Sequence, residues 1–268
     1  MKKFLPAAFI AISIIIPCKT YAFDITVGVT TWYAWMEQYM FSPHYGERID
    51  MRNDSLFFGP VMSVKFNEDF NLTLVFLHSR FDLEGDDAPT GIMEKKFTSK
   101  RYDADLALNY RLNNYFKIFA GIKYLEFNIL QFRHLPDPYN THVYTVNNGK
   151  HKSLGPGSGL SFTCPVSIID NLFLLAILSG FYLFPASSEK LEYRSSTAKL
   201  SETQISYKEY GVNTTLQIAY YIEPLQTVIS LGGRMQYFIT KYKEDDYPIK
   251  ITHPLYGITL AATYTFNF

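Results

Sequence analysis

The chain has 268 residues with 25 basic and 25 acidic side chains, 17% aromatic residues and two cysteines. A formal net charge of zero argues against a protein that binds nucleic acid through a basic surface, and two cysteines are too few for a disulfide scaffold. A mean hydropathy of −0.05 disfavours a bundle of membrane helices, since each needs about 20 mostly apolar residues. The 22 Phe and 21 Tyr exceed what a disordered chain carries.

Residues 1–22 have the order of a secretory signal peptide. A dilysine at 2–3 precedes an apolar run over 4–16, and Thr20 and Ala22 place small residues before the predicted cleavage site. The alternative is a buried N-terminal helix. Cleavage near Ala22 removes three lysines and no acid, so the net charge becomes −3.

The rest of the chain, 23–268, alternates between apolar and polar residues with a period of two, as β-strands do. The segment 256–268 is the clearest example, with aromatic and aliphatic residues on one face and mostly Thr, Gly and Asn on the other. Two segments are less distinct: 171–184 is apolar on both faces, and 153–166 contains a proline and three glycines. The alternation predicts ten strands: 24–36, 54–66, 70–82, 99–111, 116–130, 153–166, 171–184, 206–222, 226–241 and 254–268.

The connections between these segments alternate strictly between short and long. The short ones are 67–69, 112–115, 167–170 and 223–225. The long polar ones are 37–53, 83–98, 131–152, 185–205 and 242–253. Transmembrane barrels have this arrangement of tight periplasmic turns and longer outer loops, and closure removes the exposed edges of an open sheet. We therefore predict an all-β fold, an antiparallel up-and-down transmembrane β-barrel of ten strands, with eight or twelve as alternatives.

The predicted outward aromatic residues gather at strand ends, and the chain finishes with Tyr264, Phe266 and Phe268 in alternation. In this the sequence resembles the bacterial outer-membrane β-barrels, whose last strand typically ends in an alternating aromatic pattern with a terminal Phe. The resemblance runs from the signal peptide to Phe268 and specifies no subfamily. It implies that these three residues are the signal read by the barrel-assembly machinery. It also implies a monomer among the lipids of a Gram-negative-type outer membrane.

Outward apolar faces would turn a mixed set of polar residues into the lumen. The opposite charges either pair across a rigid interior, or their slight cationic excess favours small anions in a narrow pore. We predict a narrow porin-like channel for small solutes. The alternatives are a non-conducting structural or surface-recognition barrel, acting through loops 131–152 and 185–205, and an outer-membrane hydrolase. The lumen candidates are Lys65, Arg101, Asp103, Asp105, Arg111, Lys117, Lys123, Glu209, Arg234 and Gln236.

No catalytic constellation emerges from the sequence. Omptin proteases, also ten-stranded, use Asp and His on opposing outer loops, but loop 185–205 has neither. Outer-membrane phospholipases place His and Ser two residues apart, whereas His78 and Ser79 are adjacent and would face opposite ways. His142 and His151 share a predicted loop without the tight spacing of metal ligands. We predict neither enzyme activity nor a metal or cofactor.

Overall fold

The computed structural model describes residues 23–42, 47–85, 95–129, 150–186, 189–194, 199–243 and 250–267. The predicted signal peptide and the terminal Phe268 lie outside these ranges. The helical element in them is one 3-10 turn, η1 (Glu223–Leu225). Within the described ranges, no helix has the length and apolar character needed to cross a bilayer.

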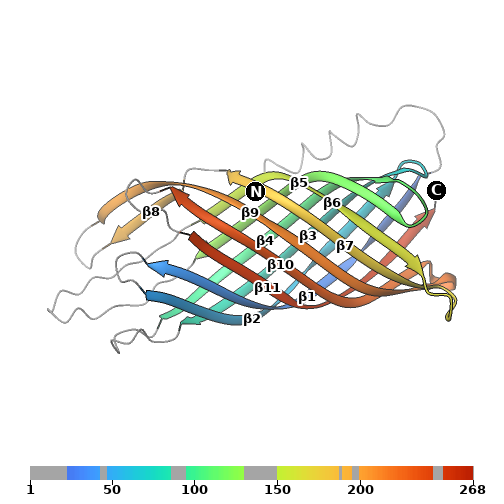
Figure 1. The fold of residues 1–268 in the computed structure, drawn as a ribbon, viewed down its shortest axis with the longest axis horizontal. Helices are drawn as coiled ribbons and strands as arrows, with labels where there is room; N and C mark the ends of the chain where they lie inside the picture. The colour runs from blue at the N-terminus through green and yellow to red at the C-terminus, as the bar shows by residue number, and fades with distance from the viewer. Residues whose placement is uncertain are drawn as a thin grey trace.

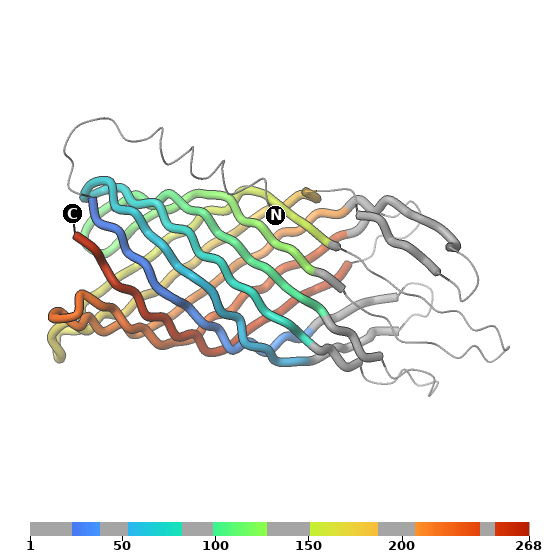
Figure 2. Tube along the Cα trace, turned by 180° about the vertical axis from the view of Figure 1, so that it is seen from behind, coloured from blue at the N-terminus to red at the C-terminus, as the bar shows by residue number. Residues whose placement is uncertain are grey.

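Ten long antiparallel strands form a closed barrel, and an eleventh, short strand extends its wall. The strands are β1 (Asp24–Ser42), β2 (Glu47–Lys65), β3 (Phe70–Gly85), β4 (Lys95–Arg111), β5 (Phe116–Ile129), β6 (Lys150–Pro165), β7 (Leu172–Pro185), β8 (Glu189–Arg194), β9 (Lys199–Ile222), β10 (Thr227–Lys243) and β11 (Lys250–Asn267). Each barrel strand pairs with the next, and β11 closes the ring on β1, from Asp24↔Asn267 to Met40↔Ile251. Figure 2 shows the first strand, in blue, beside the last, in red.

The prediction of a ten-stranded barrel is confirmed, but several predicted outer strand ends are too short. β1 continues to Ser42 rather than residue 36, and β9 begins at Lys199 rather than residue 206. The predicted loop 185–205 includes β8, which pairs with the first part of β9. The paired sequences of β8 and the first part of β9 are mostly polar. Strands beyond the bilayer do not contact lipid, so they do not need an apolar face. The short turns gather at the end of the barrel where the C-terminus lies, and β8 lies at the other end (Figure 1).

Side-chain alternation divides every barrel strand into a lipid face and a lumen face. On β4, Leu106 and Leu108 are exposed outward, while Arg101 and Asp103 are buried inside. The register of β7, ambiguous in the sequence, places Phe181 and Leu183 inward and Tyr182 and Phe184 outward. The exposed centre of the lipid face is aliphatic and includes Leu74, Leu106, Ile122, Leu160, Leu216, Leu231, Ile258 and Leu260.

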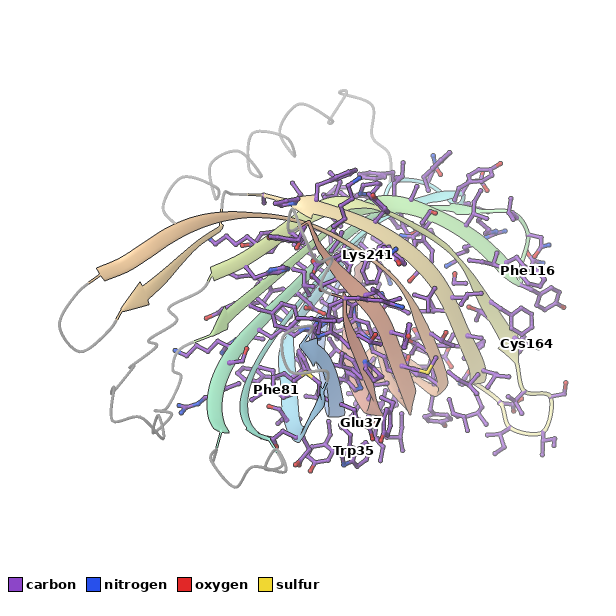
Figure 3. The ribbon with its side chains drawn as sticks, turned by 60° about the vertical axis from the view of Figure 1, so that its left-hand side comes forward. Trp35, Glu37, Phe81, Phe116, Cys164 and Lys241 are labelled. Carbon is purple, nitrogen blue, oxygen red and sulfur yellow. The ribbon has the colours of Figure 1, made fainter. Side chains whose placement is uncertain are left out.

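Outward aromatic side chains form two belts, as expected at the two interfaces of a membrane barrel. The inner belt, near the short turns, contains Phe70, Tyr110, Phe116, Tyr220, Tyr264 and Phe266. The outer belt contains Tyr33, Trp35, Tyr102, Tyr124, Tyr182, Tyr210, Tyr237 and Tyr256. Figure 3 shows Phe116 and Cys164 at one end of the barrel and Phe81 toward the other.

Just beyond the outer belt, the outward-facing residues are mostly charged. We call this set the outer charged ring: Glu37, Asp54, Arg80, Lys100, Glu126, Lys152, Lys208, Lys241 and Lys250. Tyrosines of the belt donate hydrogen bonds to its acids: Tyr33 to Asp54, Tyr124 to Glu126 and Tyr256 to Glu37. A phenol between an apolar band and a carboxylate is suited to the membrane–water boundary. The ring therefore marks the outer limit of the membrane-spanning wall.

Candidate functional site: a packed layer across the lumen and the cavity beneath it

Large apolar side chains fill the lumen in its outer half. They come from strands β1, β2, β3, β5, β7, β10 and β11 and form one buried cluster, which we call the packed layer: Trp32, Ala34, Met36, Phe57, Leu77, Phe81, Leu125, Phe181, Leu183, Phe238 and Leu255. Trp32 stacks on Phe57 at 4.9 Å between ring centroids, and Phe57 meets Phe81 edge-on at 5.4 Å. Trp32, Phe57 and Phe238 have 0% exposed surface. The layer therefore leaves no water-accessible surface on these lumen-facing rings.

Arg101 lies buried within the packed layer, with its charge paired and surrounded by aromatic rings. Its Nε and Nη2 donate to the two carboxylate oxygens of Asp103 at 2.8 and 2.9 Å, and Nη2 also donates to Gln236. The guanidinium carbon lies 4.9 Å from the ring centroid of Phe127 and 5.2 Å from that of Phe238. Bidentate pairing and cation–π contacts offset the high cost of burying this charge.

A second ion pair, between Lys123 and Asp105, lies beside the first. A third cation, Arg234, lies near them without a carboxylate partner among the described residues. Lys123 on β5 donates to both oxygens of Asp105 at 3.0 Å and is 4.0 Å from Asp103. The guanidinium of Arg234 on β10 is 4.6 Å from the ring centroid of Trp32. In the part of the chain that the structure describes, no carboxylate lies within ion-pair distance of Arg234. Three cations against two acids leave one positive charge in excess here.

A cavity of about 210 Å³ lies in the lumen between the packed layer and the short turns. Its wall consists mainly of small and polar side chains and includes Thr73, Asn109, Gly121, Gly157, Asn213 and Thr215. Asp105, Lys123 and Arg234 also line it. The Nε of Arg234 and the Oδ1 of Asn213 are buried without a hydrogen-bond partner among the described residues. Apolar residues, among them Val75, Phe119 and Ile177, complete the wall, so the cavity is of mixed character with an excess of positive charge.

A third polar cluster surrounds Glu209 near the outer end of the lumen. One carboxylate oxygen accepts from His151 at 2.8 Å and from Thr240 at 2.9 Å, and the other accepts from Ser153. The Oγ1 of Thr240 is also 3.1 Å from Nε2 of His253. Both Ser153 and His151 thus bond to the carboxylate, an arrangement that differs from a serine activated by a histidine base. The hydrogen bonds instead compensate the burial of Glu209.

This cluster was not predicted, because His151 and His253 fall in the predicted outer loops 131–152 and 242–253. That placement is wrong: both lie on strands, β6 and β11, and both are buried in the lumen. Alternation in the sequence held the signal, since His151 precedes Ser153 by two residues, and Ile251, His253 and Leu255 follow one another at the same spacing. The polar composition around them concealed it.

The ten predicted lumen residues divide into an interior set and a rim set. Seven lie in the polar clusters or on the cavity wall described above: Arg101, Asp103, Asp105, Lys123, Glu209, Arg234 and Gln236. The other three, Lys65, Arg111 and Lys117, lie near the short turns, at the ends of β2, β4 and β5. Lys65 pairs with Asp24 at 3.2 Å, and Arg111 donates to Asn114 in the adjoining turn at 3.3 Å. The cations therefore do not form a single constriction.

His78, Tyr264 and Phe266, which the sequence also singled out, lie on the outward face. His78 points outward and stacks on Tyr102 at 4.5 Å, while Ser79 points inward to Ser55 at 2.6 Å, so the predicted opposite orientation is confirmed. Tyr264 and Phe266 contact each other edge-on at 4.6 Å on the lipid face. The third residue of the predicted assembly signal, Phe268, lies outside the described residues. Within the described ranges, no three His, Cys, Asp or Glu residues are grouped to hold a metal ion.

Scans against protein-family models and against curated proteins found no match. Among solved structures, the chain is similar to the outer membrane protease OmpT of Escherichia coli, with a TM-score of 0.52 and 9% identity over 94% of this chain and 99% of that one. It is also similar to the translocator domain of the autotransporter NalP from Neisseria meningitidis, with a TM-score of 0.43 and 9% identity over 97% and 94%. At such identities the likeness concerns the fold alone. The chain thus has the fold of the bacterial outer-membrane β-barrels, closed by ten antiparallel strands.

Proposed function

We propose that the protein is a non-conducting outer-membrane barrel that acts at the cell surface through the part of its wall beyond the membrane. The observation that carries this proposal is the packed layer. Rings from strands on different sides of the barrel meet in the lumen with no exposed surface, and paired charges fill the space among them. Such an interior supports rigidity rather than passage of solutes.

The lengths of the strands support the second half of the proposal. A transmembrane β-strand needs about 9–11 residues, whereas β1 and β2 have 19 each and β9 has 24. The short turns adjoin the inner belt, so the extra residues lie beyond the outer charged ring. There β8 adds a further strand to the start of β9. The protein thus presents an ordered β-wall, suited to contacts with a partner outside the cell.

A narrow channel with a preference for small anions is the second candidate. The cavity of about 210 Å³ and the excess positive charge of Arg234 favour it. Conduction would require the packed layer to open, since it separates this cavity from the outer end of the lumen. We rank this candidate second for that reason.

Planar-bilayer recording of the refolded protein separates the two candidates. We expect no conductance steps from the wild type or from Arg234→Gln, in a bilayer where a reconstituted porin gives steps. Steps from the wild type whose anion preference falls in Arg234→Gln would favour the channel instead. A heat-dependent shift in gel mobility should accompany each preparation and shows that the barrel has folded.

Cysteine labelling on intact cells tests which end of the barrel faces outward. Cys164 lies near the short turns, and Glu202 lies on the part of β9 that pairs with β8. A membrane-impermeant maleimide should label the Glu202→Cys variant but leave the wild type, with Cys164 alone in the described wall, unlabelled. Labelling of Cys164 on intact cells, without labelling of the introduced cysteine, would reverse the orientation and refute the proposal.

A further inference from the structure

Three lysines of the outer charged ring lie side by side on neighbouring strands. Lys241 on β10 is the register partner of Lys208 on β9 and of Lys250 on β11. All three are exposed, and alternation places them on the outward face, since Tyr207, Glu209, Thr240 and Ile251 beside them point inward. We call these residues the lysine row; Lys241 is labelled in Figure 3.

The lysine row has an unfavourable charge arrangement. Directly opposite residues of an antiparallel pair have Cβ atoms about 4.5–5.5 Å apart, and like charges at that spacing destabilise a sheet. Within the described ranges, no carboxylate lies within ion-pair distance of any of the three amines. The Nζ of Lys241 is instead 5.3 Å from the ring centroid of Tyr210, a cation–π contact. An anion at the row would relieve this repulsion.

The opposite arrangement occurs at the same level on β5 and β6. There Glu126 and Lys152 are register partners, and their charged atoms form an ion pair at 3.8 Å. The three acids of the ring accept hydrogen bonds from tyrosines: Asp54 from Tyr33, Glu126 from Tyr124 and Glu37 from Tyr256. Arg80 and Lys100 are also register partners of like charge, on β3 and β4. The lysine row differs from them in joining three cations on three neighbouring strands.

We propose that Lys208, Lys241 and Lys250 bind the phosphate groups of an anionic glycolipid in the outer leaflet of the membrane. Lysine amines are point charges that bind phosphate well. The row lies just beyond the belt residues Tyr210, Tyr237 and Tyr256, so a headgroup placed on it would direct its acyl chains along the apolar outward face. Lipid headgroup phosphates are the anions available at this depth, next to a hydrocarbon surface.

Native mass spectrometry of the refolded full-length protein tests the proposal with three probes: lipid A carrying two phosphates, the same lipid without phosphates, and inorganic phosphate. The wild type should retain the phosphorylated lipid and lose it in the variant Lys208→Gln/Lys241→Gln/Lys250→Gln. We expect affinity to fall about fivefold for each lysine removed. The control Lys65→Gln/Lys117→Gln/Lys152→Gln changes the net charge equally and should retain the lipid.

Thermal unfolding in a neutral detergent gives an independent measure. Without lipid, the lysine-row variant should unfold at a higher temperature than the wild type, because the repulsion is gone. Added phosphorylated lipid should raise the unfolding temperature of the wild type alone.

Equal lipid retention by the wild type and the lysine-row variant would overturn the proposal. Equal retention of the dephosphorylated lipid, or saturation by inorganic phosphate alone, would overturn it as well.

Discussion

The half of the lumen at the packed layer and the half near the short turns are built from the same ten strands but contain different side chains. In the outer half, aromatic rings and paired charges such as Arg101 and Asp103 exclude water. In the half near the short turns, smaller residues such as Thr, Asn and Gly line a cavity of about 210 Å³ together with a few apolar side chains. Alternation therefore decides which side chains face the lumen, while their size decides whether the lumen is sealed.

The largest expected effect comes from breaking the buried ion pair of the outer half. Asp103→Asn leaves the Arg101 charge buried without a carboxylate in bidentate contact and should lower the free energy of unfolding by about 3–5 kcal/mol. Urea titration in detergent micelles, followed by tryptophan fluorescence, measures this directly, because Trp32 lies in the packed layer. Replacing both partners, as Arg101→Met/Asp103→Leu, should cost less than the single change. A double variant that is worse than Asp103→Asn would contradict this account of the pair.

Truncation of a ring tests whether packing separates the two halves. Phe238 has no exposed surface and contacts both Phe127 and His253. Phe238→Ala should therefore cost about 3–5 kcal/mol. Thr215, which lines the cavity, provides the matched change in the half near the short turns, and Thr215→Ala should cost less than about 1 kcal/mol. Similar losses in the same urea titration would show that the two halves are equally packed.

Most of the architecture could be predicted from the sequence, because the side chains of a barrel strand alternate between lipid and lumen with a period of two residues. The alternation around Arg101 and Asp103 gave the correct face for both residues, and the short connections gave the turns to within a few residues. The outer strand ends could not be predicted, since strands beyond the membrane lose their apolar face and resemble polar loops. His151 and His253 were missed for that reason.

The state of the lumen was not predictable from the sequence for a different reason. Arg101 and Lys65 are both cationic, and both point into the lumen. Aromatic rings enclose Arg101, whereas Lys65 is half exposed at the rim. The difference depends on which side chains of distant strands meet them across the barrel. Arg101, for example, contacts Gln236, which is 135 residues away in the sequence. A single sequence has no local signal for such contacts.

Two inward glycines differ in how closely a neighbouring strand approaches them. Gly121 and Gly157 are register partners on β5 and β6. A Cβ at Gly121 would lie 1.9 Å from the carbonyl oxygen of Leu106, whereas a Cβ at Gly157 would be 3.5 Å from its nearest neighbour, the oxygen of Gly180. Gly121→Ala should thus cost about 1–3 kcal/mol, and Gly157→Ala less than about 1 kcal/mol. Equal losses in urea titrations would mean that close strand approach is not the role of Gly121.

The smallest effect is expected at the rim near the short turns, where a pair of opposite charges is exposed to water. Lys65 and Asp24 are 3.2 Å apart, but their side chains are 49% and 31% exposed. Solvent and salt screen such pairs, so Lys65→Gln should cost between 0 and about 1 kcal/mol, and even less at high salt.

The loss of stability from Asp103→Asn should depend little on salt, since no solvent reaches that pair. Unfolding free energies of both variants at low and high salt therefore compare charge pairing in the two halves directly. A salt-sensitive loss at Asp103 would mean that water enters the outer half, and the sealed lumen on which the proposed function rests would have to be abandoned.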